Sequence, residues 1–316
     1  MKMVKTIVTG SSGYVASELI PLFEQKADLV GVDQVASEQT ILQVPIESPA
    51  LADYLQQFSD IEFKVINLAA ARFDFGARPE DYYRLNVECH ERFLATLDAF
   101  KVNHYIHISS VAALDGEFID YNESLSCDDA YRSTKYLQDI MIQKWCGDRG
   151  IKLTTLYPSA VFSDDPRADT NIGKLQTISR YVPFIPKIEV AKSLTYLPAF
   201  CRFIVDSAEG NVAAGRYLAI EKPVLTVSRI IQAVSGSSVK VIHIPGLEIA
   251  MQTLAYLFYA LGCFGKFDLK LTPNRVVKLF SDTSYNNIKK NDIDIDTYSR
   301  LNEEDLIDIL KRLGQL

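Results

Sequence analysis

The stretch of sequence that decides the fold is residues 5–23, KTIVTGSSGYVASELIPLF. It begins with the pattern of a buried strand, turns at GSSG, and continues with apolar residues at the spacing of a helix. Gly10 would permit a tight turn, Gly13 would let the backbone approach a pyrophosphate, and Ala16 would let the helix pack closely on its strand. Amides at the start of a helix can bind phosphate, so the stretch predicts a dinucleotide-binding turn.

An acidic residue follows this turn at the spacing expected for a ribose-binding group. Asp33 ends the run LVGVD and lies 20 residues after Gly13. A carboxylate at that place can accept hydrogen bonds from the adenosine ribose diol and would repel a 2′-phosphate. We therefore expect NAD, rather than NADP, as the cofactor.

The first half of the chain alternates short apolar runs with longer mixed segments, which predicts parallel strands joined by helices. Runs rich in Val, Ile and Leu without strict alternation favour strands that are covered on both faces. The predicted fold class is therefore α/β, with a doubly wound parallel sheet. The expected strands are residues 5–9, 29–32, 65–68, 105–108 and 153–156.

The second half has a different pattern, because prolines punctuate shorter elements after Pro158. We expect a substrate-binding region here and a terminal helix at residues 302–313. Residues 249–265, IAMQTLAYLFYALGCFG, are 17 positions without a charge, close to the length of a membrane span. Gln252 and Thr253 interrupt the run, so it predicts a buried helix or a lid over an apolar pocket, without stable membrane insertion. Contact with a membrane surface is the alternative.

Composition narrows the classes of partner and ligand. The net charge is −7 and no block of Lys and Arg stands out, which argues against nucleic acid as a partner. The five cysteines and four histidines show no metal-ligand spacing, so no metal site is expected. Met1 leads almost directly into an apolar strand pattern without the sections of a secretory signal, and we expect a cytoplasmic protein.

A second cluster of residues predicts proton chemistry. Tyr131 and Lys135 are four positions apart in AYRSTKYLQD, so on a helix they share one face, and the ammonium can lower the pKa of the phenol. Tyr131 could then exchange a proton with a substrate oxygen while hydride moves between carbon and a nicotinamide. Lys135 would also hold the nicotinamide ribose. Ser110, in ISSVAALDG, is the candidate hydroxyl that polarises the substrate oxygen.

These motifs, with NLAA at 67–70, Asn86-Val87 and LYPSAVF at 156–162, resemble the extended short-chain dehydrogenase/reductases, also called the NAD-dependent epimerase/dehydratase family. The resemblance implies an NAD-binding Rossmann domain at residues 1–160 and a smaller C-terminal substrate-binding region, mainly at 161–316, of which about 194–222 returns to the Rossmann domain. It implies a catalytic triad of Ser110, Tyr131 and Lys135. The implied cofactor-binding residues are Gly10, Ser12, Gly13, Tyr14, Val15, Asp33, Ala69, Ala70, Asn86, Tyr131, Lys135 and Pro158.

The sequence also departs from the family pattern. Asn67 stands where the family often has His, Pro45 where it commonly has Asp, and Tyr157 where an Arg is frequent. The Ser-Ser motif is followed by VAALDG, so an alignment on the glycine would place Val111 at the position of the catalytic hydroxyl. A one-residue insertion keeps Ser110 there, and we prefer that alignment.

The substrate is implied by two further stretches, residues 184–208 and 271–292, which are similar to segments of nucleotide-sugar epimerases and reductases. That similarity places Lys192, Ser193 and Arg275 near a diphosphate. The leading hypothesis is an NAD-dependent enzyme that either epimerises a nucleoside-diphosphate sugar through a keto intermediate or reduces a 4-keto sugar. A hydroxysteroid-type dehydrogenase and a non-catalytic dinucleotide-binding regulatory protein are the alternatives. A homodimer agrees with the resemblance, although the sequence leaves the oligomeric state open.

Overall fold

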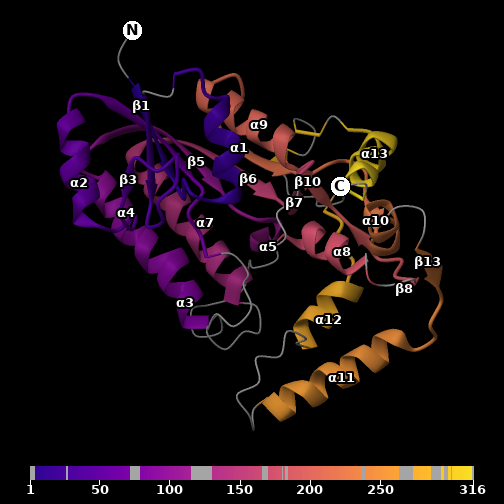
Figure 1. The fold of residues 1–316 in the computed structure, drawn as a ribbon. Coiled ribbons are helices and arrows are strands. Elements are labelled where there is room, and N and C mark those ends of the chain that lie inside the picture. The colour runs from indigo at the N-terminus through magenta and orange to yellow at the C-terminus, as the bar shows by residue number, and fades with distance from the viewer. Residues whose placement is uncertain are drawn as a thin grey trace. The chain divides into compact units, whose positions relative to one another are not determined.

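The computed structural model describes residues 4–25, 28–71, 79–114, 130–165, 170–179, 181, 184–235, 239–262, 273–285, 293–294, 298–299 and 301–314. Two compact units make up the chain (Figure 1). The first unit contains Met1–Pro158, Leu197–Ala219 and Lys290–Tyr298. The second unit contains Ser159–Tyr196, Ile220–Lys289 and Ser299–Leu316.

The first unit is built on one eight-stranded sheet in the order β14-β11-β6-β5-β4-β1-β2-β3, in which every pairing is parallel. The chain runs outward from the central β1 to β2 and β3, then returns to the other side of β1 to add β4, β5 and β6. This is the predicted doubly wound α/β fold, and the prediction is confirmed. The strands are β1 Val4–Thr9, β2 Leu29–Asp33, β3 Leu42–Gln43, β4 Glu62–Asn67, β5 Lys101–Ile108, β6 Lys152–Pro158, β11 Arg216–Ala219 and β14 Ile293–Asp294.

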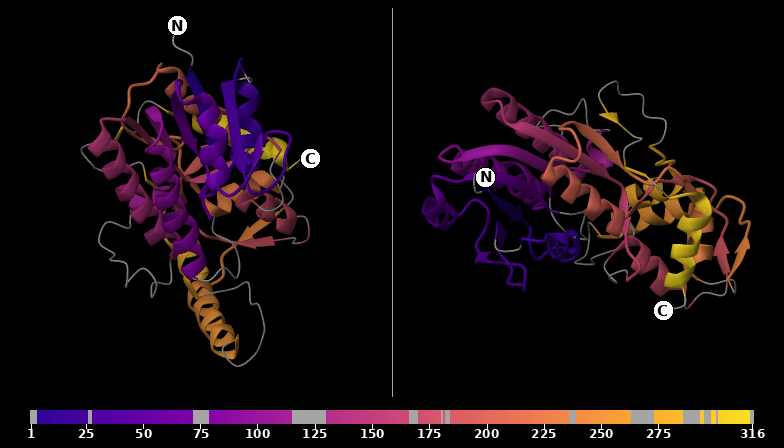
Figure 2. Two further views of the ribbon diagram at one scale, coloured as in Figure 1. Left: turned by 90° about the vertical axis from the view of Figure 1, so that its left-hand side faces the viewer. Right: turned by 90° about the horizontal axis from the view of Figure 1, so that it is seen from above.

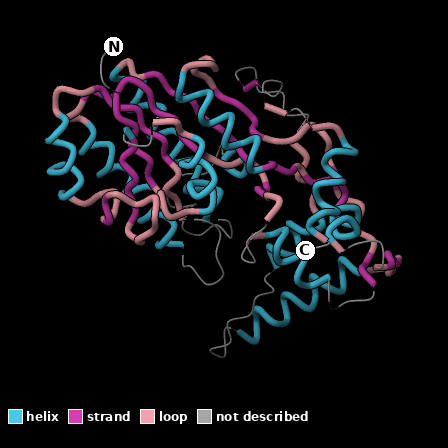
Figure 3. The backbone as a smooth tube through the Cα atoms, turned by 45° about the horizontal axis from the view of Figure 1, so that its top comes forward, coloured by secondary structure: helices cyan, strands magenta, loops and turns pink. Residues whose placement is uncertain are grey.

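Helices cover both faces of this sheet, as the views in Figure 2 and Figure 3 show. On one face α2, α4 and α7 bury a core that includes Ile7, Val65, Phe93, Tyr105 and Trp145. On the other face α1 and α9 pack against each other. Burial on both faces explains why the strands read as unbroken apolar runs. The helices are α1 Tyr14–Leu19, α2 Pro49–Leu55, α3 Pro79–Tyr83, α4 Cys89–Leu97, α5 Val111–Leu114, α7 Ala130–Arg149 and α9 Leu197–Glu209, with short helical turns η1 Ile20–Leu22, η3 Gln56–Phe58 and η4 Arg84–Glu88.

The second unit combines two-stranded pairs with helices around its own core. The pairs are β7 with β10, β9 with β12 and β8 with β13. The predicted terminal helix is α13, which begins after Asn302 with a reciprocal capping box between Asn302 and Asp305. The elements are β7 Ala160–Phe162, β8 Phe184–Pro186, β9 Ala191–Lys192, β10 Leu194–Tyr196, β12 Leu225–Thr226, β13 Lys240–Ile242, α8 Asn171–Ser179, α10 Val227–Val234, α11 Leu247–Gly262, α12 Pro273–Phe280 and α13 Glu303–Leu313.

Residues 249–262 of the uncharged run belong to α11, whereas 263–265 lie outside the described residues. At 249–257 the expectation of a buried helix is wrong. Ala255 is buried, but Ile249, Tyr256 and Leu257 are 72%, 60% and 54% exposed. The reason is that α11 packs against α12 and leaves the rest of its circumference uncovered by described residues. Among the helices that the structure describes, none has the length and apolar character needed to cross a membrane.

Candidate active site

The glycine-rich turn connects β1 to α1 and takes a conformation that needs glycine at its first position. Gly10 has a φ of 71°, and a Cβ there would lie 2.9 Å from the backbone nitrogen of Ala69 and the carbonyl carbon of Leu68. Such contacts with backbone atoms cannot be relieved by a side-chain rotation. The turn ends at Gly13, which is extended and caps α1, so the amides of Tyr14 and Val15 begin the helix.

Asp33 lies directly beside this turn. Its Oδ2 accepts a hydrogen bond from the amide of Ser12 at 3.1 Å, and its Oδ1 accepts one from the amide of Val35 at 2.9 Å. The two predicted parts of the cofactor site, the turn and the acidic residue, therefore lie together at the carboxyl ends of β1 and β2.

The neighbouring strand β4 brings Ala69 and Ala70 to the same edge of the sheet. The hydroxyl of Thr9 at the end of β1 accepts a hydrogen bond from the Ala69 amide at 3.2 Å, and Ala70 is exposed. The strand order reverses between β1 and β4. Ligands of open α/β sheets bind outside the carboxyl ends of the strands at such a reversal.

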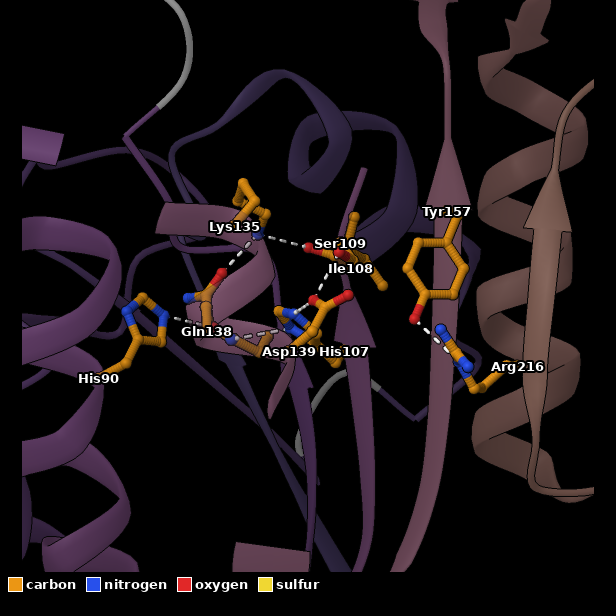
Figure 4. A network of polar contacts seen from close by, with 10 residues as sticks. His90, His107, Ile108, Ser109, Lys135, Gln138, Asp139, Tyr157 and Arg216 are labelled. Atoms are coloured by element: carbon orange, nitrogen blue, oxygen red, sulfur yellow. Dashed lines mark hydrogen bonds and ion pairs between the residues drawn. The ribbon is translucent and has the colours of Figure 1, made fainter. Parts of the chain in front are cut away.

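Tyr131 and Lys135 lie one turn apart on α7, as their spacing predicted. Lys135 is 1% exposed, and its Nζ donates to the carbonyl of Ile108 at 3.1 Å and to Oε1 of Gln138 at 2.5 Å (Figure 4). The Tyr131 ring packs edge-on against Tyr82 with centroids 6.4 Å apart. Burial lowers the pKa of Lys135 to about 8, and the carboxylate of Asp139 acts in the opposite direction.

Ser109, Ser110 and Val111 have different surroundings, which bears on the choice of catalytic hydroxyl. Ser109 is buried and donates to Oδ1 of Asp139 at 2.6 Å. Val111 is buried as the first residue of α5. Ser110 is partly exposed, and its Oγ accepts a hydrogen bond from the amide of Ala112 at 3.3 Å, so its proton is not engaged by that contact. Among these three positions, the geometry favours Ser110.

Asn86 joins two parts of the site from within η4. It is buried, and its Oδ1 accepts from the amide of Ala71 at 2.7 Å, just beyond Ala70. Its Nδ2 donates to the hydroxyl of Thr134 at 3.2 Å, on α7 beside Lys135. Asn86 thus ties the segment after β4 to the helix that carries Tyr131 and Lys135.

The sequence reasoning missed a buried row of polar side chains beneath these residues (Figure 4). Asn67 Oδ1 accepts from the Thr9 hydroxyl at 2.7 Å and lies 3.2 Å from His90 Nε2, and its Nδ2 donates to His107 Nδ1 at 3.3 Å. His107 Nε2 in turn donates to Asp139 Oδ1 at 3.0 Å. Burial lowers the pKa of His107 and lowers that of His90 to about 3. Both histidines are therefore neutral links in this row.

The candidate substrate residues lie in the second unit. Lys192 ends β9, and its Nζ donates to the carbonyl of Ser281 at 2.6 Å. Burial lowers its pKa to about 8, against the effect of the Asp282 carboxylate. Ser193 is buried, and its Oγ accepts from the amide of Tyr285 at 3.1 Å. Arg275 belongs to α12, but its side chain lies outside the described residues.

The parallel sheet, the glycine turn with Asp33, and the Tyr131–Lys135 helix together define a dinucleotide-dependent enzyme of the short-chain dehydrogenase type. The family model of the NAD-dependent epimerase/dehydratase family matches residues 6–196, and the chain belongs to that family. Comparison with curated protein sequences gives no match.

Solved structures share the fold at low sequence identity. UDP-N-acetylglucosamine 4-epimerase from Methanobrevibacter ruminantium M1, in complex with UDP-N-acetylmuramic acid, is 16% identical over 100% of this chain and 98% of its own, with a TM-score of 0.64. UDP-glucuronic acid 4-epimerase from Bacillus cereus, in complex with UDP-glucuronic acid and NAD, is 18% identical over 76% and 86%, with a TM-score of 0.59. dTDP-glucose 4,6-dehydratase from Bacillus anthracis, in complex with NAD, is 12% identical over 76% and 85%, with a TM-score of 0.58.

Proposed function

We propose that this protein is an NAD-dependent enzyme that acts on a nucleoside-diphosphate sugar, by epimerisation through a keto intermediate or by reduction of a 4-keto sugar. The observation that carries the proposal is the position of buried Lys135, one turn after Tyr131, with its ammonium held by the carbonyl that precedes Ser109 and Ser110. A base, a polarising hydroxyl and a dinucleotide turn at one sheet edge are what reversible oxidation of a secondary alcohol needs. The names of the solved structures support the sugar nucleotide as the substrate class.

The residues at the sheet edge fit NAD. Gly10 packs so closely on Leu68 and Ala69, just after β4, that a Cβ would contact their backbone atoms. Asp33, beside the turn, is placed to bind the adenosine ribose. Bound NAD would supply the acceptor and donor of hydride. The residues proposed to hold it are Gly10, Ser12, Gly13, Tyr14, Val15, Asp33, Ala69, Ala70, Asn86, Tyr131, Lys135 and Pro158.

The protein's own residues would handle the proton. Tyr131, one helical turn from Lys135, takes the proton of the substrate hydroxyl when the alcohol is oxidised and returns it when the ketone is reduced. Ser110 donates a hydrogen bond to the same oxygen and stabilises the charge that develops there. The mechanism is the same for epimerisation and reduction, which differ in whether the sugar turns before hydride returns.

The second unit is proposed to bind the sugar nucleotide, with Lys192, Ser193 and Arg275 near the diphosphate. The first unit is proposed to be the NAD-binding domain. A cytoplasmic location and a homodimer stay predictions.

A ligand and substrate panel tests this proposal. Thermal-shift measurements with UDP, dTDP, GDP and sterols should show stabilisation by at least one nucleotide, because a ligand that binds the folded state raises its stability. UDP-glucuronic acid, UDP-N-acetylglucosamine and dTDP-glucose should then be assayed for epimer formation, and 4-keto sugars for NADH oxidation. Stabilisation by sterols alone would overturn the sugar assignment in favour of a hydroxysteroid-type dehydrogenase.

The cofactor assignment predicts a change in nucleotide preference in the variant Asp33→Asn. An asparagine keeps one of the two oxygens that accept from the Ser12 and Val35 amides, and it loses the charge that repels a 2′-phosphate. We expect wild-type protein to prefer NAD and the variant to shift the NAD-to-NADP affinity ratio about tenfold or more toward NADP. Fluorescence titration with NADH and NADPH measures both constants. A wild-type preference for NADPH would contradict the assignment to Asp33.

A further inference from the structure

The feature that the proposed reaction does not use is the exposed apolar surface of the second unit. It includes Ile242 and Ile244 before α11, Ile249, Leu254, Tyr256 and Leu257 on α11, and Val277 on α12, each at least 37% exposed. We call this set the α11 surface. Isolated exposed apolar residues are ordinary, whereas several of them along one face of a helix indicate an interaction site.

The exposed face of α11 carries mainly apolar residues, whereas a helix that faces water usually carries polar residues there. At 100° per residue, Ile249, Thr253, Tyr256 and Leu257 share one face, and that face is exposed. Its polar member, Thr253, donates its hydroxyl to the carbonyl of Ile249 at 2.8 Å within the helix. The polar pair Glu248 and Gln252, hydrogen bonded to each other at 3.2 Å, lies along one border of this face. The exposed face of α11 is therefore mainly apolar, and the hydroxyl of Thr253 is already hydrogen bonded within the helix.

The length of α11 indicates how it could meet lipid. Its 16 residues span about 24 Å at 1.5 Å per residue, which is less than the roughly 30 Å of a bilayer's hydrocarbon core. Tyr256 has an apolar ring and a polar hydroxyl, the kind of side chain that is enriched where a membrane meets water. A helix of this length with one apolar face suits a position in the plane of the membrane surface.

The charge of the same region specifies the lipid. Residues 240–290 contain seven Lys and Arg but three Asp and Glu, whereas the rest of the chain contains 26 Lys and Arg but 37 Asp and Glu. By sequence, the stretch that contains α11 is thus basic in a chain that is otherwise acidic. Basic residues next to an apolar helix face are attracted to anionic headgroups, whereas the acidic remainder is repelled by them.

We propose that the α11 surface docks this protein on an anionic membrane surface. The helix lies in the plane of the headgroups, with Ile249, Tyr256 and Leu257 entering the apolar layer. Burial of these side chains supplies affinity, and the basic stretch supplies the preference for anionic lipid. The docking does not involve the sheet edge that carries Gly10, Asp33 and Lys135. The two proposals can therefore be tested independently.

Co-sedimentation of the full chain with vesicles tests this proposal. We expect binding to phosphatidylglycerol-containing vesicles, at least about tenfold weaker binding to phosphatidylcholine vesicles, and loss of binding as salt rises from 0.1 to 1 M. Leu257→Glu should weaken binding to the anionic vesicles about tenfold or more, because it removes a leucine that would enter the apolar layer and adds a charge that anionic lipid repels. A side chain that is more than half exposed can be replaced without loss of folding, which the melting temperature checks.

Ile41→Glu is the matched control. Ile41 is 55% exposed, against 54% for Leu257, but it belongs to the first unit. The control should bind vesicles as wild type does. Equal loss in both variants, or no binding of wild type to anionic vesicles, would overturn the proposal. Self-association that is lost in Leu257→Glu, in the absence of vesicle binding, would assign the surface to a second copy of the chain instead.

Discussion

Replacement of Tyr131 by phenylalanine is expected to lower kcat by about 10²–10⁴-fold, the range typical of a lost general acid or base. The phenol is the group that exchanges a proton with the substrate oxygen, and phenylalanine keeps the ring that packs against Tyr82. The fold and the glycine turn are untouched, so the affinity for NADH should stay within about threefold of wild type. Steady-state kinetics on the active substrate and NADH fluorescence measure the two quantities.

Tyr136→Phe is the matched control for this variant. Tyr136 lies on the same helix, five residues further on, where it lines a cavity of the first unit that Tyr131 does not line. It should retain the activity of wild type. If Tyr131→Phe also retained activity on a substrate that the wild type converts, Tyr131 would not be the proton-transfer group. If cofactor bound but no panel substrate turned over in either protein, the non-catalytic alternative would replace the enzyme.

The parallel sheet could be predicted from the sequence because its central strands are buried on both faces. Each of the five expected strands is present, but β4 and β5 begin three and four residues earlier than expected. Those extra residues include Glu62 and Lys101, which pair with each other in the sheet. Charged residues at a strand start carry no apolar signal, and only pairing with a neighbouring strand identifies them.

The short strands β3, β11 and β14 could not be predicted from periodicity for a related reason. β3 and β14 have two residues each, and their pairing with β2 and β11 depends on where the rest of the chain brings them. The exposure of α11 was not predicted because an apolar run favours burial of the helix but does not show which other element, if any, covers it. The sequence does show that Ile249, Tyr256 and Leu257 share one face of the helix, but it does not show that this face is exposed.

The candidate site divides in the same way. Gly10, Asp33, Tyr131 and Lys135 were found because each follows a local spacing rule. The row from Asn67 through His107 to Asp139 joins three separate elements, β4, β5 and α7, and no local spacing predicts its hydrogen bonds. One signal was available, since Asp139 lies four residues after Lys135 and so one turn further along the same helix.

Asp139 is the residue of this row with the largest expected effect on the reaction. Its carboxylate accepts hydrogen bonds from Ser109 and His107, and it raises the pKa of Lys135 against the opposing effect of burial. It touches neither substrate nor cofactor in the proposed mechanism, so it is a positioning residue. One side of Asp139 lines a cavity of about 310 Å³ with Tyr157 and Arg216, which gives the carboxylate contact with solvent.

Asp139→Asn is expected to move the high-pH limb of the kcat profile to lower pH by about one unit, the low end of the effect of one neighbouring charge. Without the carboxylate, the pKa of Lys135 falls below its value of about 8, and the ammonium loses its proton at lower pH. A neutral amine no longer stabilises the negative charge that Tyr131 carries during proton transfer, so activity declines earlier as pH rises. Profiles from pH 6 to 10 measure the shift.

Ser109→Ala separates this electrostatic effect from a structural one. It removes the 2.6 Å hydrogen bond to Asp139 but leaves the carboxylate charge, so the high-pH limb should stay where it is in wild type. Asparagine can still accept from His107, which keeps the buried row connected in Asp139→Asn. An equal loss of kcat at every pH in Asp139→Asn would mean that Asp139 only supports the fold around Lys135. A displaced limb in that variant alone means that the charge of Asp139 sets the pH range in which the Tyr131–Lys135 pair works.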